Sequence, residues 1–290
     1  MRHFSAWAAG ALAAAIIIGC GPGKQLPDEV PKSNTTERTT TEPKEKVPTV
    51  SDPAAKEIVD RAIKACTQNN PDLLAKGKLS KVTANGTVKL PAEASGQFVE
   101  VPTFRTVLAR WPDELKFTLD YKAHRTGLMT MILRGQFTWW GIDRTQNPNP
   151  NPQAIEDLMR TDGLAQHWLP LLFPLVEPKA VLFEPQKGVG TPPADVVRFA
   201  LPERPVYQLF FDAATGHLTR VEYTHTELQA RVQKLWTFSD HKPFAGRILP
   251  TKLEYTYNPE RGKKDTVEQW TVENWEFPES FDDSVFQPPK

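Results

Sequence analysis

The sequence is poor in cysteine, has no net charge, and contains no long hydrophobic run after its first twenty residues. Only two cysteines, Cys20 and Cys66, occur among 290 residues, and a domain of roughly 240 residues does not need a disulfide framework. The 35 basic and 35 acidic side chains cancel. This balance argues against nucleic acid as a partner, because phosphate binding normally requires a basic patch.

The sequence also lacks the common catalytic motifs. It contains no G-x-S-x-G elbow, H-E-x-x-H zinc motif, phosphate-binding P-loop or C-x-x-C pair. Ser239, Asp240 and His241 have the residue types of a hydrolytic triad, but neighbours on a strand point to opposite faces, and triads are assembled from distant segments. The histidines lie far apart, without metal-ligand spacing. The sequence therefore predicts no enzyme, no cofactor and no metal site.

The first twenty residues have the layout of a bacterial export signal. A cationic start precedes an apolar run over residues 4–18, which is too short for a comfortable bilayer span. Gly19 and Cys20 close this run. A small residue before a cysteine resembles a bacterial lipobox, in which the thiol is diacylated and the chain is cleaved before it. We interpret residues 1–19 as a lipoprotein signal peptide and Cys20 as the lipidation site, with a plain secretory signal or an uncleaved anchor as alternatives.

Lipidation of Cys20 predicts a protein that sits on a membrane through its N-terminal acyl chains without crossing it. Each buried methylene contributes about 0.8 kcal/mol, so two or three chains anchor firmly. Gly21 stands where an Asp resembles an inner-membrane retention signal, so the periplasm-facing outer membrane of the bacterial cell envelope is favoured over the inner membrane. Residues 20–51 comprise the lipidated cysteine and a polar, proline-rich stretch whose composition predicts a disordered tether.

The folded domain is expected over residues 52–290 and begins with a helix. Asp52 suits the N-cap and Pro53 the first turn. Apolar residues then recur at three- and four-residue spacing, which predicts one buried stripe ending at Cys66, a buried thiol. This stripe contains Ala55, Ile58, Val59, Ala62, Ile63 and Cys66.

Further along the chain the apolar period becomes two, which is typical of half-buried antiparallel strands. Residues 153–167 interrupt the strands with a helical composition. They lead into the apolar, proline-broken segment 169–176, which must pack on the sheet or cover something, and which we interpret as part of a lid. Strands are predicted at 103–111, 115–121, 128–142 as a hairpin, 196–201, 206–212, 218–226, 233–240, 248–257 and 266–275.

Four local patterns accompany this order of elements. Residues 211–221 place a D-x-x-T-G turn before a strand, and residues 238–251 turn and re-enter with G-x-x-x-P. Residues 275–289 end with a phenylalanine before a proline, and residues 135–140 form a glycine turn followed by aromatics. Together they resemble the periplasmic lipoprotein-carrier superfamily of LolA, LolB and the N-terminal domain of RseB. The resemblance implies an α+β, mostly β fold, in which a curved, antiparallel, incomplete β-barrel wraps around helices.

Large apolar side chains are predicted on the inner face of this sheet and on segment 169–176. Strand alternation places on the inner face Phe117, Leu119, Tyr207, Leu209, Phe211, Val221, Tyr223, Trp236, Phe238, Leu253 and Tyr255. They fill a core or line a cavity for a hydrophobic ligand, which is an acyl chain, a lipid or a lipoprotein. Trp139 and Trp140 are adjacent, so one of them faces outward with no core to explain it. The predicted ligand-binding residues are Phe117, Leu119, Trp140, Leu171, Phe173, Phe211, Tyr223, Trp236 and Tyr255.

The sequence thus predicts a monomeric, membrane-anchored envelope lipoprotein that binds an apolar ligand without catalysis. The alternative is a non-catalytic sensory or scaffold module that binds another envelope protein. A hollow under segment 169–176 would favour the first function, and a filled interior with an exposed aromatic patch would favour the second.

Overall fold

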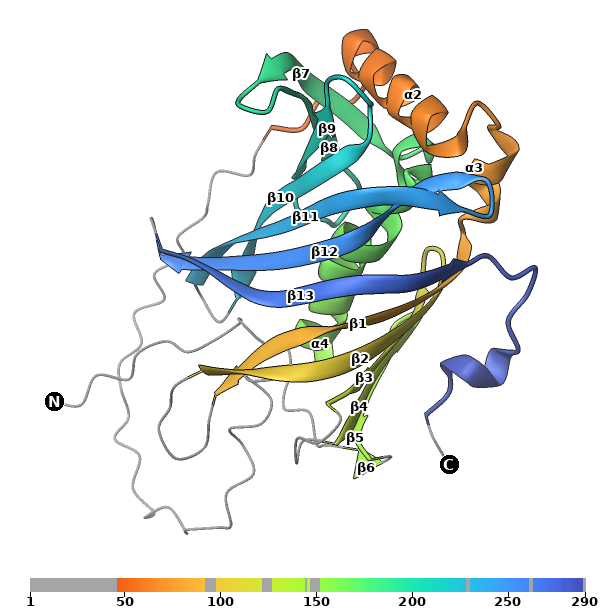
Figure 1. Ribbon diagram of the computed structural model, residues 1–290, viewed down its shortest axis with the longest axis vertical. Coiled ribbons are helices and arrows are strands. Elements are labelled where there is room, and N and C mark those ends of the chain that lie inside the picture. The colour runs from red at the N-terminus through yellow and green to blue at the C-terminus, as the bar shows by residue number, and fades with distance from the viewer. Residues whose placement is uncertain are drawn as a thin grey trace, which may run out of the picture.

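One antiparallel sheet dominates the structure (Figure 1). The predicted signal peptide, Cys20 and the tether up to residue 45 lie outside the described residues. The computed structural model describes residues 46–91, 98–121, 127–143, 145–146, 152–227, 230–260 and 263–288. Within them the sheet has thirteen strands, in the order β6-β5-β4-β3-β2-β1-β13-β12-β11-β10-β9-β8-β7.

The strands fall into two runs along the chain, separated by helices. The first run is β1 (Leu79–Pro91), β2 (Phe98–Arg110), β3 (Glu114–Asp120), β4 (Leu128–Arg134), β5 (Phe137–Ile142) and β6 (Thr145–Gln146). The second run is β7 (Val181–Val189), β8 (Ala194–Ala200), β9 (Tyr207–Asp212), β10 (Leu218–Glu227), β11 (Ala230–Phe244), β12 (Arg247–Glu260) and β13 (Lys263–Glu276).

The helices precede, separate and follow these runs. The longer ones are α2 (Pro53–Thr67) and α4 (Pro152–Gly163), with the short α3 (Asp72–Lys76) after α2. A π-helical turn, η1 (Leu164–Trp168), continues α4 and is followed by the 3-10 turns η2 (Leu169–Leu171), η3 (Phe173–Val176) and, near the C-terminus, η4 (Asp283–Phe286). No helix in the described part of the chain is long and apolar enough to cross a membrane.

The two runs join through β1 and β13, which pair near the middle of the sheet. The strands β6 and β7 end the order on opposite sides and do not pair with each other, so the barrel stays open. The sheet curves around α4, which lies on its concave side in Figure 1. This arrangement confirms the predicted incomplete antiparallel barrel wrapped around helices.

The strands alternate between a buried and a wetter face, as their sequence period predicts. The pattern is clearest in β3, where every second side chain is buried. The inward side chains expected from alternation are all buried in one continuous core, which confirms their predicted orientation. They are Phe117, Leu119, Tyr207, Leu209, Phe211, Val221, Tyr223, Trp236, Phe238, Leu253 and Tyr255.

Helix α2 begins and packs as its sequence predicts. The Asp52 carboxylate accepts a hydrogen bond from the Ala54 amide at 2.7 Å, and Pro53 occupies the first turn. The predicted stripe is buried against β7, β8 and β12. Burial raises the pKa of the Cys66 thiol to about 12, so this cysteine is a protonated core side chain.

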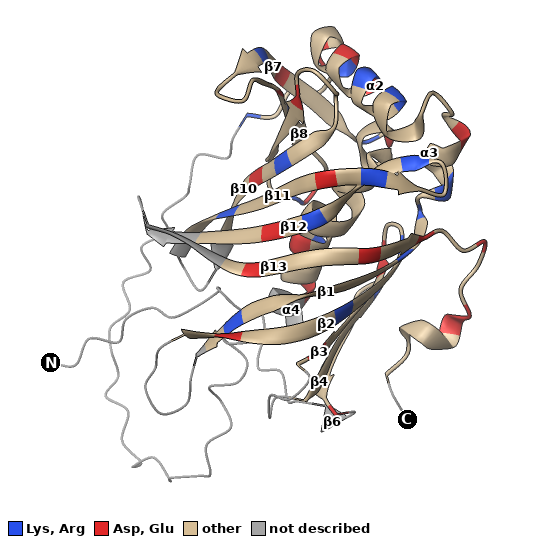
Figure 2. Ribbon diagram, viewed as in Figure 1, with Lys and Arg blue, Asp and Glu red and all other residues tan. Residues whose placement is uncertain are grey.

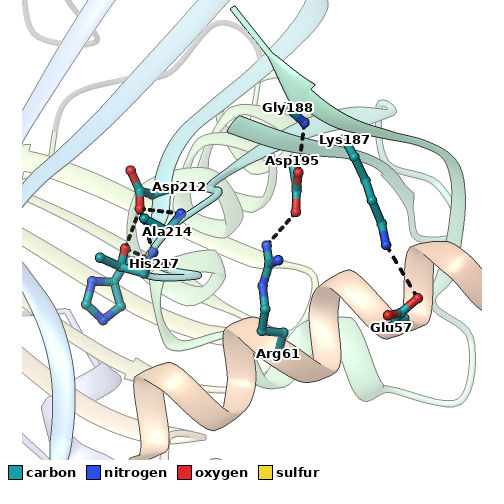
Figure 3. Close-up of polar contacts among 9 residues, drawn as sticks. Glu57, Arg61, Lys187, Gly188, Asp195, Asp212, Ala214 and His217 are labelled. Atoms are coloured by element: carbon teal, nitrogen blue, oxygen red, sulfur yellow. Dashed lines mark hydrogen bonds and ion pairs between the residues drawn. The ribbon is translucent and has the colours of Figure 1, made fainter. Parts of the chain in front are cut away.

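Ion pairs fasten α2 to the β7–β8 hairpin (Figure 3). The Arg61 guanidinium lies 2.6 Å from the Asp195 carboxylate, whose other oxygen accepts a hydrogen bond from the Gly188 amide at 2.9 Å. Lys187 and Glu57 form a looser, exposed pair at 3.6 Å. In the view of Figure 2, acidic and basic positions are mixed on α2 and along β10 to β13, consistent with the zero net charge.

The D-x-x-T-G turn has a clear structural reason (Figure 3). The Asp212 carboxylate accepts hydrogen bonds from the Ala214 and Thr215 amides at 3.1 and 2.7 Å, and these bonds lower the pKa of Asp212. Gly216 follows with a φ of +76°, close to Ala65 of α2. The turn therefore closes the β9–β10 hairpin and packs it onto the helix.

A second, smaller core lies on the convex face and corrects the expectation for the outward tryptophan. Trp140 belongs to the inner core, whereas Trp139 faces outward beside its cross-strand partner Ile132. Both outward side chains are buried, and Phe286 of η4 is fully buried where η4 packs on β3 and β4. The C-terminal segment thus supplies a core for this face.

Three strands lie outside the ranges predicted from the sequence: β1, β7 and the two-residue β6. Strand β1 buries small residues such as Ser80 and Ala84 between larger ones, which weakens the hydrophobic alternation. Strand β7 contains Pro185 and two irregularities in its pairing with β8, features suited to an edge strand. The chain turns directly after β7 at Gly190, which has a φ of +80°.

Candidate functional site

The described residues form an open cleft with a volume of about 490 Å³. Four segments form its walls: the β2–β3 turn, the junction of α4 with η1, the chain after η3, and the β8–β9 loop. Its lining combines apolar side chains with charged ones. The lining residues are Trp111, Pro112, Arg160, Leu164, Trp168, Glu177, Pro178, Lys179, Leu201, Pro202, Glu203 and Arg204.

Aromatic rings form the base of this cleft. Trp111 packs edge-to-face on Trp168, with ring centroids 5.0 Å apart, and on Phe173, with centroids 5.4 Å apart. Trp168 is only 1% exposed, and its indole N–H has no hydrogen-bond partner within the described residues. Edge-to-face packing holds the rings in place, so the cleft has a firm apolar floor.

Part of the charge on the cleft walls is neutralised by neighbours. Arg160 lies 2.7 Å from Asp113 and 2.8 Å from Glu156, and it donates to the backbone oxygen of Gly135. Glu177 pairs with Lys78 at 2.8 Å. These side chains are held by the protein and are poorly placed to bind a ligand.

Two cations on the walls differ from Arg160. Within the described part of the chain, neither Lys179 nor Arg204 forms an ion pair with a carboxylate. Burial lowers the pKa of Arg204, and the positive charge of Arg160 lowers it further. Glu203 adds one carboxylate beside Arg204. The cleft therefore presents two cationic side chains and one acidic one around an apolar floor.

A buried polar cluster joins α4 to the sheet. The Lys234 ammonium lies 2.9 and 3.1 Å from the two oxygens of Asp162, and the Tyr223 hydroxyl donates to the same carboxylate. The Tyr207 hydroxyl donates to the backbone oxygen of Thr161 at 3.1 Å. Burial raises the pKa of Tyr207 and Tyr223, so both hydroxyls stay protonated donors.

A second cluster joins η1 to β2 and β13. The Arg105 guanidinium donates to Gln166 at 3.0 Å and lies 4.4 Å from the centroid of Trp270. Burial lowers its pKa to about 10, which still leaves it charged. The Glu268 side chain remains partly accessible, and desolvation raises its pKa while the charge of Arg105 opposes this. These clusters fix the helical segment inside the barrel.

The nine predicted ligand-binding residues lie in the packed interior and do not line this cleft. Each is at most 9% exposed, and all belong to the same core as Leu169, Leu172 and Leu175. Segment 169–176 thus packs down onto the sheet, the first of the two arrangements expected for it. Phe173 alone reaches the cleft base, through its contact with Trp111.

Sequence reasoning missed the cleft because its walls come from four separate segments. The local signal was weak but present: Trp111 and Leu201 each follow the last residue of a strand and stand immediately before a proline. Such large apolar residues at strand ends line the rim of a curved sheet. Arg160 and Arg204 carried no signal, because single charged residues in helices and loops are ordinarily solvated.

The described residues include the Ser239-Asp240-His241 run and candidate metal ligands. They contain no group of three or more His, Cys, Asp or Glu side chains that could hold a metal ion. His241 bonds the backbone oxygen of Leu218 and stacks on His217 with centroids 4.7 Å apart, while Asp240 contacts Lys242 and Thr251. The three adjacent residues at 239–241 therefore do not form a relay.

The fold is that of the LolA superfamily, as the sequence resemblance predicted. A LolA superfamily protein from Nitrosomonas europaea aligns with a TM-score of 0.51 and 12% identity, covering 80% of this chain and 97% of that one. A domain described as an outer membrane lipoprotein-sorting protein, from Vibrio parahaemolyticus, aligns with a TM-score of 0.47 and 11% identity over 80% and 97%. MucB aligns with a TM-score of 0.26 and 14% identity over 81% and 63%.

At these identities the likeness extends to the fold alone. No protein family and no curated protein matches the chain in sequence. The function must therefore be inferred from the residues of this chain.

Proposed function

We propose that this protein is an envelope lipoprotein, anchored by acyl chains on Cys20, whose half-barrel binds a hydrophobic ligand without catalysing a reaction. The open cleft with its aromatic floor is the observation that carries this proposal. Its volume of about 490 Å³ falls within the ~300–1,000 Å³ of typical ligand pockets. The LolA fold of the chain agrees with such a role.

In this proposal, the nine interior residues predicted to bind ligand form the core that supports the cleft. Phe173 holds the floor through its contact with Trp111. The other eight side chains belong to the continuous core between the helices and the sheet. A ligand in the cleft contacts Trp111 and Trp168 first. Deeper entry requires that segment 169–176 move away from the sheet.

The packed interior also favours a second candidate, in which the domain is a non-catalytic scaffold that binds another envelope protein. The continuous core from α2 to β13 is what such a module requires. The two functions differ in one observable: only the first predicts a stoichiometric apolar ligand in the cleft.

Ligand binding can be tested on the full-length protein purified from membranes. Native mass spectrometry is expected to reveal a noncovalent lipid adduct, and an environment-sensitive fatty-acid probe is expected to bind and be displaced by lipid. Leu201→Asp places a charge on the half-buried cleft wall and should abolish probe binding. Val189→Asp, at an exposed position of β7 outside the cleft, is the matched control and should bind normally.

The absence of both adduct and probe binding would instead support the scaffold function. Anchoring is tested separately: Cys20→Ala should move the protein from the membrane fraction to the soluble fraction. Unchanged membrane association of this variant would contradict lipidation at Cys20.

A further inference from the structure

We propose that the cleft selects one kind of ligand: a single acyl chain whose polar head carries a negative charge, as in a fatty acid or a lysophospholipid with a phosphate head. The chain would lie on the aromatic floor, and Arg204 and Lys179 would contact the head. This inference rests on the proposed function, because it identifies the ligand of the same cleft.

The size of the cleft limits the number of chains. A volume of about 490 Å³ lies in the lower part of the ~300–1,000 Å³ range of ligand pockets. One flexible chain fits such a volume, whereas the two or three chains of a diacyl lipid or a lipidated cysteine do not. The interior offers no extension, because the side chains below the floor are packed in a continuous core.

The apolar part of the lining suits the chain. Trp111 and Leu201 are half-buried lining residues, and the buried Leu164 of η1 lines the same cleft. Covering such surface with a methylene chain removes apolar area from water on both partners, at about 25 cal/mol per Å². This contribution does not depend on the charge of the head.

The cations select the head. Arg160 and Glu177 are held in ion pairs of 2.7 to 2.8 Å. Among the described residues, the charged lining side chains outside ion pairs are the cations Arg204 and Lys179 and the carboxylate Glu203. A carboxylate or phosphate head can accept charge-assisted hydrogen bonds from both cations.

Partial burial of Arg204 also favours an anionic head. Burial is the largest effect that lowers the pKa of Arg204, and the nearby carboxylates of Asp157 and Glu203 oppose it. A negative head placed beside Arg204 acts in the same direction as these carboxylates, because an opposite charge stabilises the guanidinium. A neutral or zwitterionic head does so less effectively.

The test uses photoactivatable single-chain probes with the full-length protein, and peptide mass spectrometry to locate the cross-links. The probes carry the same diazirine chain and a carboxylate, a phosphate or an uncharged glycerol head, and a diacyl phosphatidylglycerol probe controls for chain number. The anionic single-chain probes are expected to bind at least about tenfold more tightly than the glycerol probe, as measured by the probe concentration needed to label cleft peptides.

Charge variants test the assigned residues. The double substitution Arg204→Gln with Lys179→Gln should lower the affinity for the anionic probes by about tenfold or more and change the affinity for the glycerol probe by less than twofold. Glu203→Gln should instead raise the affinity for the anionic probes. Lys56→Gln with Lys76→Gln removes the same charge from exposed positions on α2 and α3 and should change neither.

Each outcome separates this inference from the proposed function. Equal labelling of the cleft by anionic and glycerol probes, with no effect of the charge variants, overturns the selectivity but leaves hydrophobic binding intact. Labelling of the cleft by the diacyl probe as strong as by the single-chain probes overturns the size limit. No labelling of the cleft by any probe overturns both the inference and the proposed function.

Discussion

The Lys234 ammonium of β11 and the Asp162 carboxylate of α4 form an ion pair inside the half-barrel, with Nζ 2.9 Å from Oδ2. The lysine side chain is 1% exposed and the aspartate side chain 12% exposed. Tyr223 donates a further hydrogen bond to the aspartate. This cluster ties the helical segment to the concave face of the sheet.

Removing one partner of this pair should destabilise the protein strongly. Lys234→Met leaves the Asp162 carboxylate buried without its counter-charge, and we expect a loss of about 3–5 kcal/mol in the free energy of unfolding, measured by urea denaturation. Lys187→Met removes the exposed pair with Glu57 and should cost less than about 1 kcal/mol. Adding Asp162→Asn to Lys234→Met should recover part of the loss. Equal effects of the two lysine variants would show that the buried pair is not desolvated.

Gly86 should not tolerate a side chain. A Cβ at this position in β1 would collide with the backbone oxygen of Gln269 and would lie 2.6 Å from the Trp270 ring. Gly86 lies where β1 pairs with β13, the junction of the two strand runs. Gly86→Ala should therefore lower the free energy of unfolding by about 3 kcal/mol through overpacking. Gly135→Ala has open space around its Cβ but a φ of +56°, and should cost only about 1–2 kcal/mol in thermal or urea unfolding. A smaller loss for Gly86→Ala than for Gly135→Ala would contradict the packing of this junction.

His167 should make the protein sensitive to acid. Burial, together with the positive charge of Arg105, lowers the pKa of His167 to about 3. The neutral ring lies 2.9 Å from the Ser80 hydroxyl. The unfolded chain, with a histidine pKa of about 6.5, binds a proton that the folded chain excludes. Stability from this group is therefore complete above pH 6.5 and falls between pH 6.5 and 3, by up to about 1.4 kcal/mol per pH unit.

The acid dependence can be isolated with His167→Gln, which keeps a hydrogen-bonding group near Ser80 but does not titrate. Urea unfolding between pH 7 and pH 5 is expected to give a shallower loss of stability for this variant than for the original chain. Parallel pH profiles for the two proteins would mean that His167 is not held neutral in the fold.

The sequence predicted the fold where each residue's local period and turn chemistry agree with the final packing. The stripe of α2 and the alternation of β3 could be predicted because their partners only had to be apolar. The turn at Asp212 could be predicted because its carboxylate bonds its own neighbours. In β1, Gly86 carried no such signal, since its reason is the approach of Gln269, almost two hundred positions away in the chain.

The candidate site was less accessible to sequence reasoning. The inward direction of Phe211 and Tyr223 follows from strand alternation, but whether the interior is hollow depends on how segment 169–176 settles against the sheet. The ion pair of Lys234 with Asp162 is a contact between a strand and a helix, and strand alternation alone does not predict it. The cleft itself exists only where Trp111 and Arg204, ninety residues apart, meet.

The C-terminal segment should contribute to stability far more than its position near the chain end suggests. Phe286 is fully buried on the convex face, and Arg110 lies 5.3 Å from its ring centroid. Lys116 also donates to the backbone oxygen of Val285 at 3.0 Å. Phe286→Ala should therefore lose about 3–5 kcal/mol of unfolding free energy and expose Trp139 to an aqueous fluorescence quencher.

Phe281→Ala is the matched control for this substitution. Phe281 packs edge-to-face on Phe286 with centroids 5.7 Å apart but is only half-buried, and its backbone oxygen, which accepts from Arg110, is retained in alanine. Phe281→Ala should lower the free energy of unfolding by about 1 kcal/mol, because edge-to-face ring pairs contribute about 0.5–1.5 kcal/mol. If Phe286→Ala cost no more than Phe281→Ala, the outward Trp139 would have to be shielded by something other than the C-terminal segment, and the second core would lose its basis.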